Sequence, residues 1–215
     1  MSSPISPRLM KGGIVTLDPD TGIPRGTIAL QYNPDTLTRK LQPQAVSEQP
    51  DRSEILRLKG PPIETISVAA EIDATDQLAA SDATALTVGI QPQLAALETI
   101  VYPTSSQLLS NNSLAQAGML EILPMIAALP LFVWSKSRVV PVRVTDFSVT
   151  EEAFDPALNP IRAKVSLGMR VLSVTDLGFD NKGGSLFMAY QQQKEQLASK
   201  SLGGALSLLG IRGIP

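Results

Sequence analysis

The clearest pattern along the chain is an alternation of hydrophobic and polar positions between residues 131 and 174. Its first half sets valines against polar or aromatic positions: Val140, Val142 and Val144 against Arg143, Thr145 and Phe147. After a turn with two prolines and an asparagine, the alternation continues to residue 171. A period of two is typical of strands with one buried and one exposed face. We therefore expect three or four successive antiparallel strands here.

Further strands are predicted upstream from the same kind of alternation and from the turns between them. These strands are expected over residues 14–17, 27–32, 36–41, 55–58 and 63–72. Residues 42–53 are polar and contain prolines, which indicates an exposed loop. Residues 74–88 are small and polar and show no clear period.

Helical spacing of apolar residues appears in two segments. We expect a helix over residues 91–101, ended by Pro103, and a second one over residues 185–200 with Ser185 as its N-cap. Residues 104–118 lack a strong period, so we expect a surface loop there.

Composition limits the class of protein. The chain has 215 residues, of which 43% are hydrophobic, enough for one domain with a core. We expect a flexible segment over 1–12, a β domain over 13–176, and a C-terminal helix with an apolar tail over 177–215, which we interpret as an interaction arm.

Histidine and cysteine are both absent from the sequence. Their absence excludes Ser–His–Asp triads, histidine-ligated metals, disulfides and thiol chemistry, and it fits a cytoplasmic protein. The adjacent acids Glu151 and Glu152 would point to opposite faces of a strand and so would not share a substrate. The Gly183-Gly184 pair lacks a phosphate-loop context, which indicates a hinge. We expect no catalytic, cofactor-binding or metal-binding residue.

The most apolar window, residues 119–134, is only 16 residues long and is interrupted by Glu121, Pro124 and Pro130. That is too short for a spanning helix, so we expect a buried loop followed by a strand. The N-terminal residues lack the apolar core of a signal peptide.

Charge is unevenly distributed along the chain. The net charge is −2, which argues against nucleic acid as the main partner. Between Lys59 and Lys136 there is no lysine or arginine, whereas acidic residues occur throughout that stretch. This pattern indicates either one acidic face on a monomer or, in an oligomer, an acidic face that meets a basic face of the next copy.

Three segments occur in an order and spacing that resemble a known family. They are IALQYNPD at residues 28–35, IETISVAAEID at residues 63–73, and the strands of residues 131–172. Together they resemble the tube-related baseplate proteins of contractile injection systems, which are phage-tail-like particles. The resemblance implies a mainly β, α+β fold: a tail-tube-like antiparallel β-barrel or sandwich with one or two flanking helices and a C-terminal helical arm.

The resemblance also implies a function. Such proteins form six-fold rings that join the inner tube to the spike or hub, inside a particle assembled in the cytoplasm. The expected partners are other copies of the chain, the tube protein, the spike or hub protein and further baseplate proteins, without nucleic acid or membrane insertion. The chain is similar to a short form that lacks a LysM module, and it departs from its relatives at Ser135, where they often have glycine.

Eight residues are the structural or interface candidates. They are Tyr32, Asn33, Pro34, Trp134, Phe154, Pro160, Arg162 and Tyr190. The Tyr32-Asn33-Pro34 run predicts a turn in which Asn33 bonds its own backbone. Trp134 is expected to anchor either the core or a subunit contact. Arg162 is expected to pair with Glu151 or Glu152 across a hairpin.

Two alternatives remain open. An effector chaperone or cargo adaptor would use the same barrel as a monomer or dimer, which distinguishes it from a hexameric ring by stoichiometry. A carboxylate-dependent hydrolase would show turnover on a substrate panel.

Overall fold

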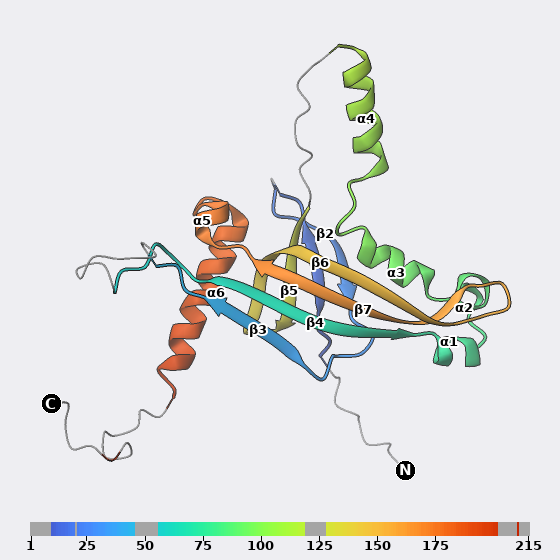
Figure 1. Cartoon of the computed structure of the whole chain (residues 1–215), viewed down its shortest axis with the longest axis horizontal. Helices are drawn as coiled ribbons and strands as arrows, with labels where there is room; N and C mark the ends of the chain where they lie inside the picture. The colour runs from blue at the N-terminus through green and yellow to red at the C-terminus, as the bar shows by residue number, and fades with distance from the viewer. Residues whose placement is uncertain (1–9, 20, 46–55, 119–127, 202–209, 211–215) are drawn as a thin grey trace.

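The computed structural model describes residues 10–19, 21–45, 56–118, 128–201 and 210. Seven strands and six helices make up this part of the chain (Figure 1). The strands are β1 Gly13–Leu17, β2 Pro24–Ala29, β3 Leu37–Gln42, β4 Ile63–Asp73, β5 Leu129–Ser135, β6 Arg138–Phe154 and β7 Pro160–Val171. The helices are α1 Thr75–Ala79, α2 Ala83–Val88, α3 Gln91–Glu98, α4 Ser105–Gln116, α5 Val174–Leu177 and α6 Lys182–Ala198.

The strands form one sheet in the order β2-β1-β5-β6-β7-β4-β3, with antiparallel neighbours throughout. A mainly β, α+β fold is therefore confirmed. The expectation of a closed barrel is wrong for the described residues, because the outermost strands β2 and β3 do not pair with each other. The expectation of one or two flanking helices is also too low.

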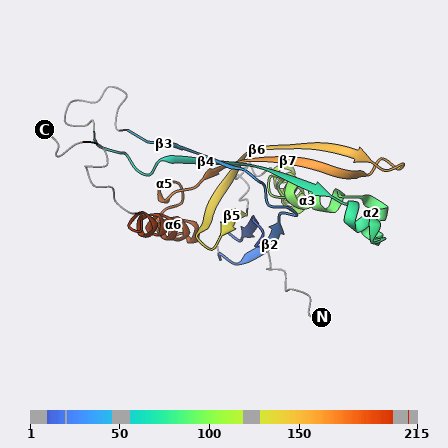
Figure 2. The ribbon, with the colours of Figure 1, turned by 90° about the horizontal axis from the view of Figure 1, so that it is seen from below.

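The physical reason for the open sheet is visible in the core. Strand β6 spans both halves of the sheet, pairing first with β5 and then with β7, and the sheet bends along it (Figure 2). Apolar side chains of α3 and α6 join the inward-facing side chains of the strands in one buried cluster. Helices thus cover the apolar surface that a closing pair of strands would otherwise bury.

A β-bulge changes the alternation within β6. The register of β6 against β7 shifts between Val144 and Asp146. An extra residue moves every later side chain to the other face of the strand. Phe147 is consequently half-buried against the core, so its predicted placement beside Arg143 on the outer face is wrong. Gly168 lies opposite the bulge, where a β-carbon would come within 2.9 Å of the Asp146 side chain.

Several predicted elements need correction. Residues 105–116 form helix α4 rather than a loop, and α1 and α2 occupy the segment without a clear period. The predicted strand over 55–58 is reduced, within its described part, to a single bridge between Leu58 and Ala45. Helix α6 begins at Lys182 with Asn181 as its N-cap, not at Ser185.

The start of α6 packs closely against the body of the protein. Gly183 and Gly184 are buried inside the first turn of the helix, and a β-carbon on Gly184 would lie 1.8 Å from the Gly178 carbonyl oxygen. The two glycines therefore allow α5 and α6 to approach each other closely, and they do not form the predicted hinge. Phe187 and Tyr190 continue the helix into the main core. The C-terminal residues 202–209 and 211–215, predicted as part of an arm, lie outside the described residues.

Within the described part of the chain, no helix is both long and apolar enough to cross a membrane.

Candidate functional site

The two edges of the sheet are the first candidate interaction surfaces. In the described residues β2 pairs only with β1, and β3 only with β4. Most residues of both strands are exposed. An exposed edge strand presents unpaired backbone N–H and C=O groups to another chain. Both edges of the sheet, β2 and β3, can therefore accept a further strand.

The turn predicted at Tyr32-Asn33-Pro34 is reduced to a bend in the connection between β2 and β3, and the hydrogen bonds of Asn33 differ from the expectation. The Asn33 side chain accepts a hydrogen bond from the Gly12 N–H at 2.9 Å and donates one to the Met10 carbonyl at 2.8 Å. Asn33 thus ties the bend to the segment before β1 instead of bonding its own backbone. Tyr32 is 47% exposed beside it and remains available for a contact.

Trp134 is a half-buried anchor on β5. Its ring stacks on Phe132, with the ring centroids 5.8 Å apart. Gly12 lies directly against the ring, because a β-carbon there would come within 2.8 Å of an indole carbon. Of the two roles predicted for Trp134, the structure places the side chain against the core of its own chain.

Phe154 and Pro160 close the β6–β7 hairpin as a register pair. Pro160 is buried, and its carbonyl accepts the Ile90 N–H at 2.9 Å, which fixes the hairpin to the start of α3. Phe154 is 49% exposed at the tip. The turn between them is organised by Asp155, whose pKa is lowered by hydrogen bonds from Asn159 and from backbone N–H groups.

Arg162 pairs with a different partner from the predicted one. Its guanidinium donates to the Asp73 carboxylate at 2.7 Å and lies 3.9 Å from Glu71. Strand β7 runs between β6 and β4, so Arg162 has acids on both sides, and Glu152 is held instead by Lys164 at 2.9 Å.

Tyr190 belongs to a buried ionic network between α6 and the sheet. Its hydroxyl donates to Glu64 Oε1 at 3.0 Å. Arg39 of β3 donates to the same oxygen at 2.7 Å, and Lys194 of α6 donates to Oε2 at 2.9 Å. Arg39 also donates to the Tyr190 hydroxyl at 3.1 Å. The network fixes α6 across β3 and β4, so Tyr190 has a structural role within this chain.

The electrostatics of this network follow from burial and charge. Burial alone would raise the pKa of Glu64, but hydrogen bonds and positive charges from Lys194 and Arg39 outweigh it and hold that pKa below its usual value. Burial and the Glu64 charge raise the pKa of Tyr190 to about 12. Sequence reasoning missed Glu64. The available signal was the position of Glu64 in the alternation of β4, since Glu64 shares the buried face of that strand with Ile66 and Val68.

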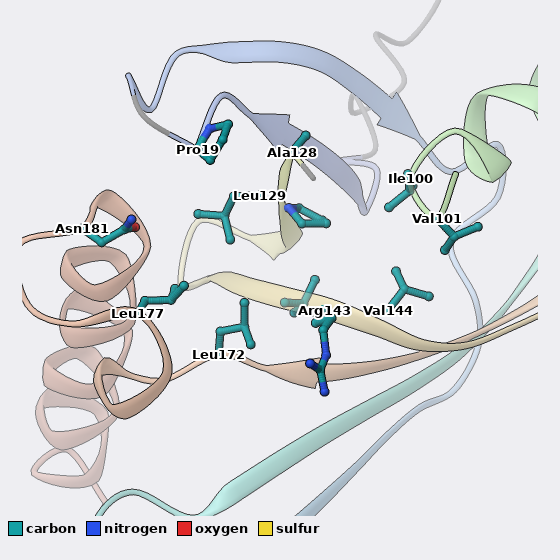
Figure 3. A pocket seen from close by; sticks show the side chains of 12 residues that line it. Pro19, Ile100, Val101, Ala128, Leu129, Arg143, Val144, Leu172, Leu177 and Asn181 are labelled. Atoms are coloured by element: carbon teal, nitrogen blue, oxygen red, sulfur yellow. The ribbon is translucent and has the colours of Figure 1, made fainter. Parts of the chain in front are cut away.

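A cavity of about 450 Å³ lies between β5, β6, α5 and the residues that follow α3 (Figure 3). Its lining is mainly apolar, and the Arg143 guanidinium points away from the apolar side chains. The Asn181 side chain at its rim accepts the Gly183 N–H at 2.7 Å as the cap of α6. The cavity therefore offers shape and apolar surface rather than a reactive group.

No group of acidic side chains spaced to hold a metal ion occurs in the described part of the chain. The features described above are contact surfaces and the two edges of the sheet. Comparison of the sequence with known protein families finds no matching model, and comparison with curated proteins finds no relative.

Proposed function

We propose that this chain is a non-enzymatic structural subunit of a contractile injection system baseplate. In this proposal it forms a ring, six-fold by the resemblance described above, that joins the inner tube to the spike or hub. The particle assembles in the cytoplasm. Its partners are other copies of the chain, the tube protein and the spike or hub protein.

The observation that carries the proposal is the open sheet. A sheet that closed on itself would have no edge left for another chain, whereas this one ends in β2 on one side and β3 on the other. Strand addition at an edge is the standard way in which a sheet continues between copies. A ring is the closed form of such a head-to-tail contact. The ordered motifs of the sequence favour a tube-like ring over other edge-joined assemblies.

A second candidate function is an effector chaperone or cargo adaptor. Helix α4 favours it: the helix projects from the body (Figure 1), has no buried residue and exposes Leu108, Leu109 and Leu114. Such a helix offers an apolar surface to a partner without requiring a ring.

The two functions are separated by electron microscopy of the full chain, alone and mixed with the co-encoded tube and spike proteins. Six-fold rings, or tube–spike junctions that fail when the chain is omitted, support the baseplate role. A monomer or dimer that joins neither protein but binds a co-encoded effector favours the chaperone.

A variant that blocks one edge of the open sheet tests whether the copies join through strand β2. Leu30 N–H bonds the Gly12 carbonyl, and hydrogen-bonded pairs alternate along an antiparallel ladder. Thr27 therefore turns its N–H away from β1, and Thr27→Pro removes that donor at a position where edge strands tolerate proline. We expect Thr27→Pro to lose rings while Thr27→Val, which keeps the N–H, retains them. Rings formed equally by both variants would contradict a contact through β2.

A further inference from the structure

The long axis of the molecule separates charges of opposite sign. We call one end the hairpin end; it comprises the β6–β7 tip, the last residues of β4, and α1 and α2 (Figure 1). Carboxylates outnumber cations there. The acids are Glu71, Asp73, Asp76, Asp82, Glu151, Glu152 and Asp155, and the cations are Arg162 and Lys164. Both cations are already ion-paired, with Asp73 and Glu152, so a negative excess remains on this end.

The opposite end, which we call the α6 end, comprises α5, α6, residues 56–62, the later residues of β3, the first residues of β4, the last residues of β7 and the β5–β6 turn (Figures 1 and 2). Among the described residues of this end, cations outnumber carboxylates. The cations are Arg39, Lys40, Arg57, Lys59, Lys136, Arg138, Arg170, Lys182, Lys194 and Lys200; the acids are Glu64, Asp176, Asp180 and Glu195. Glu64 is already matched by two cations, Arg39 and Lys194, and Asp176 by Arg170.

Each end also exposes large apolar side chains among its charges. At the hairpin end Leu158 is 78% exposed, together with Leu86 and Phe154. At the α6 end Leu56 is 94% exposed, together with Leu41 and Leu58. An apolar centre with a charged rim is the usual composition of a protein–protein contact surface.

The two ends cannot meet within one molecule, because the length of the sheet lies between them. Between two molecules they are complementary in charge and alike in apolar content. Opposite charges on two surfaces of one chain favour a heterologous contact, in which one surface of each copy meets the other surface of the next. A symmetric contact between two hairpin ends or two α6 ends would bring like charges together.

We propose that the hairpin end of one copy docks on the α6 end of a second copy of this chain, with Leu158 and Phe154 at the centre of the contact. Within the proposed ring this contact acts together with the strand addition at β2, and neither of the two alone holds the copies together; in that respect the inference rests on the proposed function. Because the contact is heterologous, it leaves a free hairpin end and a free α6 end on every dimer, so that association continues until a ring closes.

The test is sedimentation velocity of the full chain at low salt (~0.05 M) and high salt (~0.5 M), where charge attraction is largely screened. We expect oligomers at low salt and an apparent Kd at least about tenfold weaker at high salt. Leu158→Asn is expected to weaken the low-salt Kd by about tenfold, as loss of one buried leucine does.

Two charge-reversal variants make the test specific. One carries Glu151→Lys and Asp76→Lys at the hairpin end; the other carries Lys40→Glu and Lys59→Glu at the α6 end. All four side chains are exposed. Each variant alone is expected to sediment as a monomer. A mixture is expected to associate, because one variant retains an intact hairpin end and the other an intact α6 end.

Asp35→Lys is the matched control, since Asp35 is exposed between β2 and β3 and outside both ends. It should self-associate like the unmodified chain. A chain that stays monomeric at low salt, or oligomers that resist both reversals, would overturn the proposal. So would a monomer whose α6 end binds only the tube or spike protein.

The outcomes also distinguish this contact from the baseplate role. Tube–spike junctions that form with both reversal variants would keep the proposed function and overturn the contact. Charge-dependent self-association without binding to tube or spike would keep the contact and overturn the baseplate role.

Discussion

Tyr190 on α6 donates a hydrogen bond of 3.0 Å to Glu64 on β4, a carboxylate of which only 3% is exposed. The two residues are 126 positions apart in the sequence, and their contact holds the C-terminal helix to the sheet. Arg39 and Lys194 complete the network from β3 and α6.

Removal of the carboxylate should destabilise the fold more than removal of the hydroxyl. We expect Glu64→Gln to lower the free energy of unfolding by about 2 kcal/mol, because it leaves two partly buried cations without their counter-charge. Tyr190→Phe should cost about 1 kcal/mol, since Glu64 keeps both cations. Urea unfolding measures both values. Lys40→Ala, an exposed change on β3, is the control and should stay within about 0.5 kcal/mol. Equal costs for the two network variants would contradict a charge-centred network.

The same carboxylate predicts a pH dependence. The folded-state pKa of Glu64 lies below its ordinary value of 4.5. The group therefore contributes stability that is fully present above the unfolded-state pKa and is lost as pH falls through the folded-state pKa. We expect the stability gap between the unmodified chain and Glu64→Gln to be largest near neutral pH and to shrink as pH falls below about 4.5. Urea midpoints measured from pH 7 down to pH 3 check this; a gap constant over that range would contradict it.

Gly184 is predicted to tolerate no side chain. A β-carbon there would lie 1.8 Å from the Gly178 carbonyl oxygen, which belongs to the backbone and cannot rotate away. We expect Gly184→Ala to lower the free energy of unfolding by about 3 kcal/mol, at the upper end of overpacking costs. Thermal or urea unfolding measures the change. The neighbouring exposed change Ser185→Ala should have an effect within about 0.5 kcal/mol, and a similarly small effect of Gly184→Ala would refute the close approach.

Leu158 combines a positive φ of 64° with 78% exposure at the hairpin tip. A leucine in the left-handed region costs roughly 1–2 kcal/mol, whereas asparagine adopts it readily. We therefore expect Leu158→Asn to raise the free energy of unfolding of the monomer by about 0.5 kcal/mol, even though it removes an apolar side chain. Leu86→Asn, a change of another exposed leucine inside helix α2, should give no gain. Urea unfolding at high salt checks both; a loss of stability in Leu158→Asn would show that Leu158 packs within its own chain.

The strands were predictable because their signal is local. Alternation over residues 63–72, 139–144 and 162–171 matches the buried faces of β4, of the first part of β6 and of β7, since a strand repeats every two residues. The bulge near Thr145 was not predictable from alternation, because its effect on Phe147 depends on the register with β7. Whether the sheet stays open or closes into a barrel depends on how α3 and α6 cover it, which is a property of the tertiary structure.

The candidate residues divide along the same line. The hairpin turn between Phe154 and Pro160 could be predicted from neighbouring residues. The partners of Arg162 and Tyr190 could not, because Asp73 and Glu64 lie 89 and 126 positions away. Helix α4 was missed because its sequence carries no apolar stripe, and accordingly none of its residues is buried.

Helix α4 is expected to depend on its N-terminal cap more than on packing. Thr104 and Gln107 form a reciprocal capping box, in which the Thr104 hydroxyl accepts the Gln107 N–H and the Gln107 side chain accepts the Thr104 N–H. A lost cap of this type costs about 1 kcal/mol. Since α4 buries no residue, we expect Thr104→Ala to speed amide hydrogen exchange across residues 105–116 by about fivefold, while the global unfolding midpoint stays unchanged. Ser110→Ala within the same exposed helix is the control and should slow exchange slightly, because alanine is the better helix former. A fall in the global midpoint with Thr104→Ala would instead mean that α4 is packed against the rest of the protein.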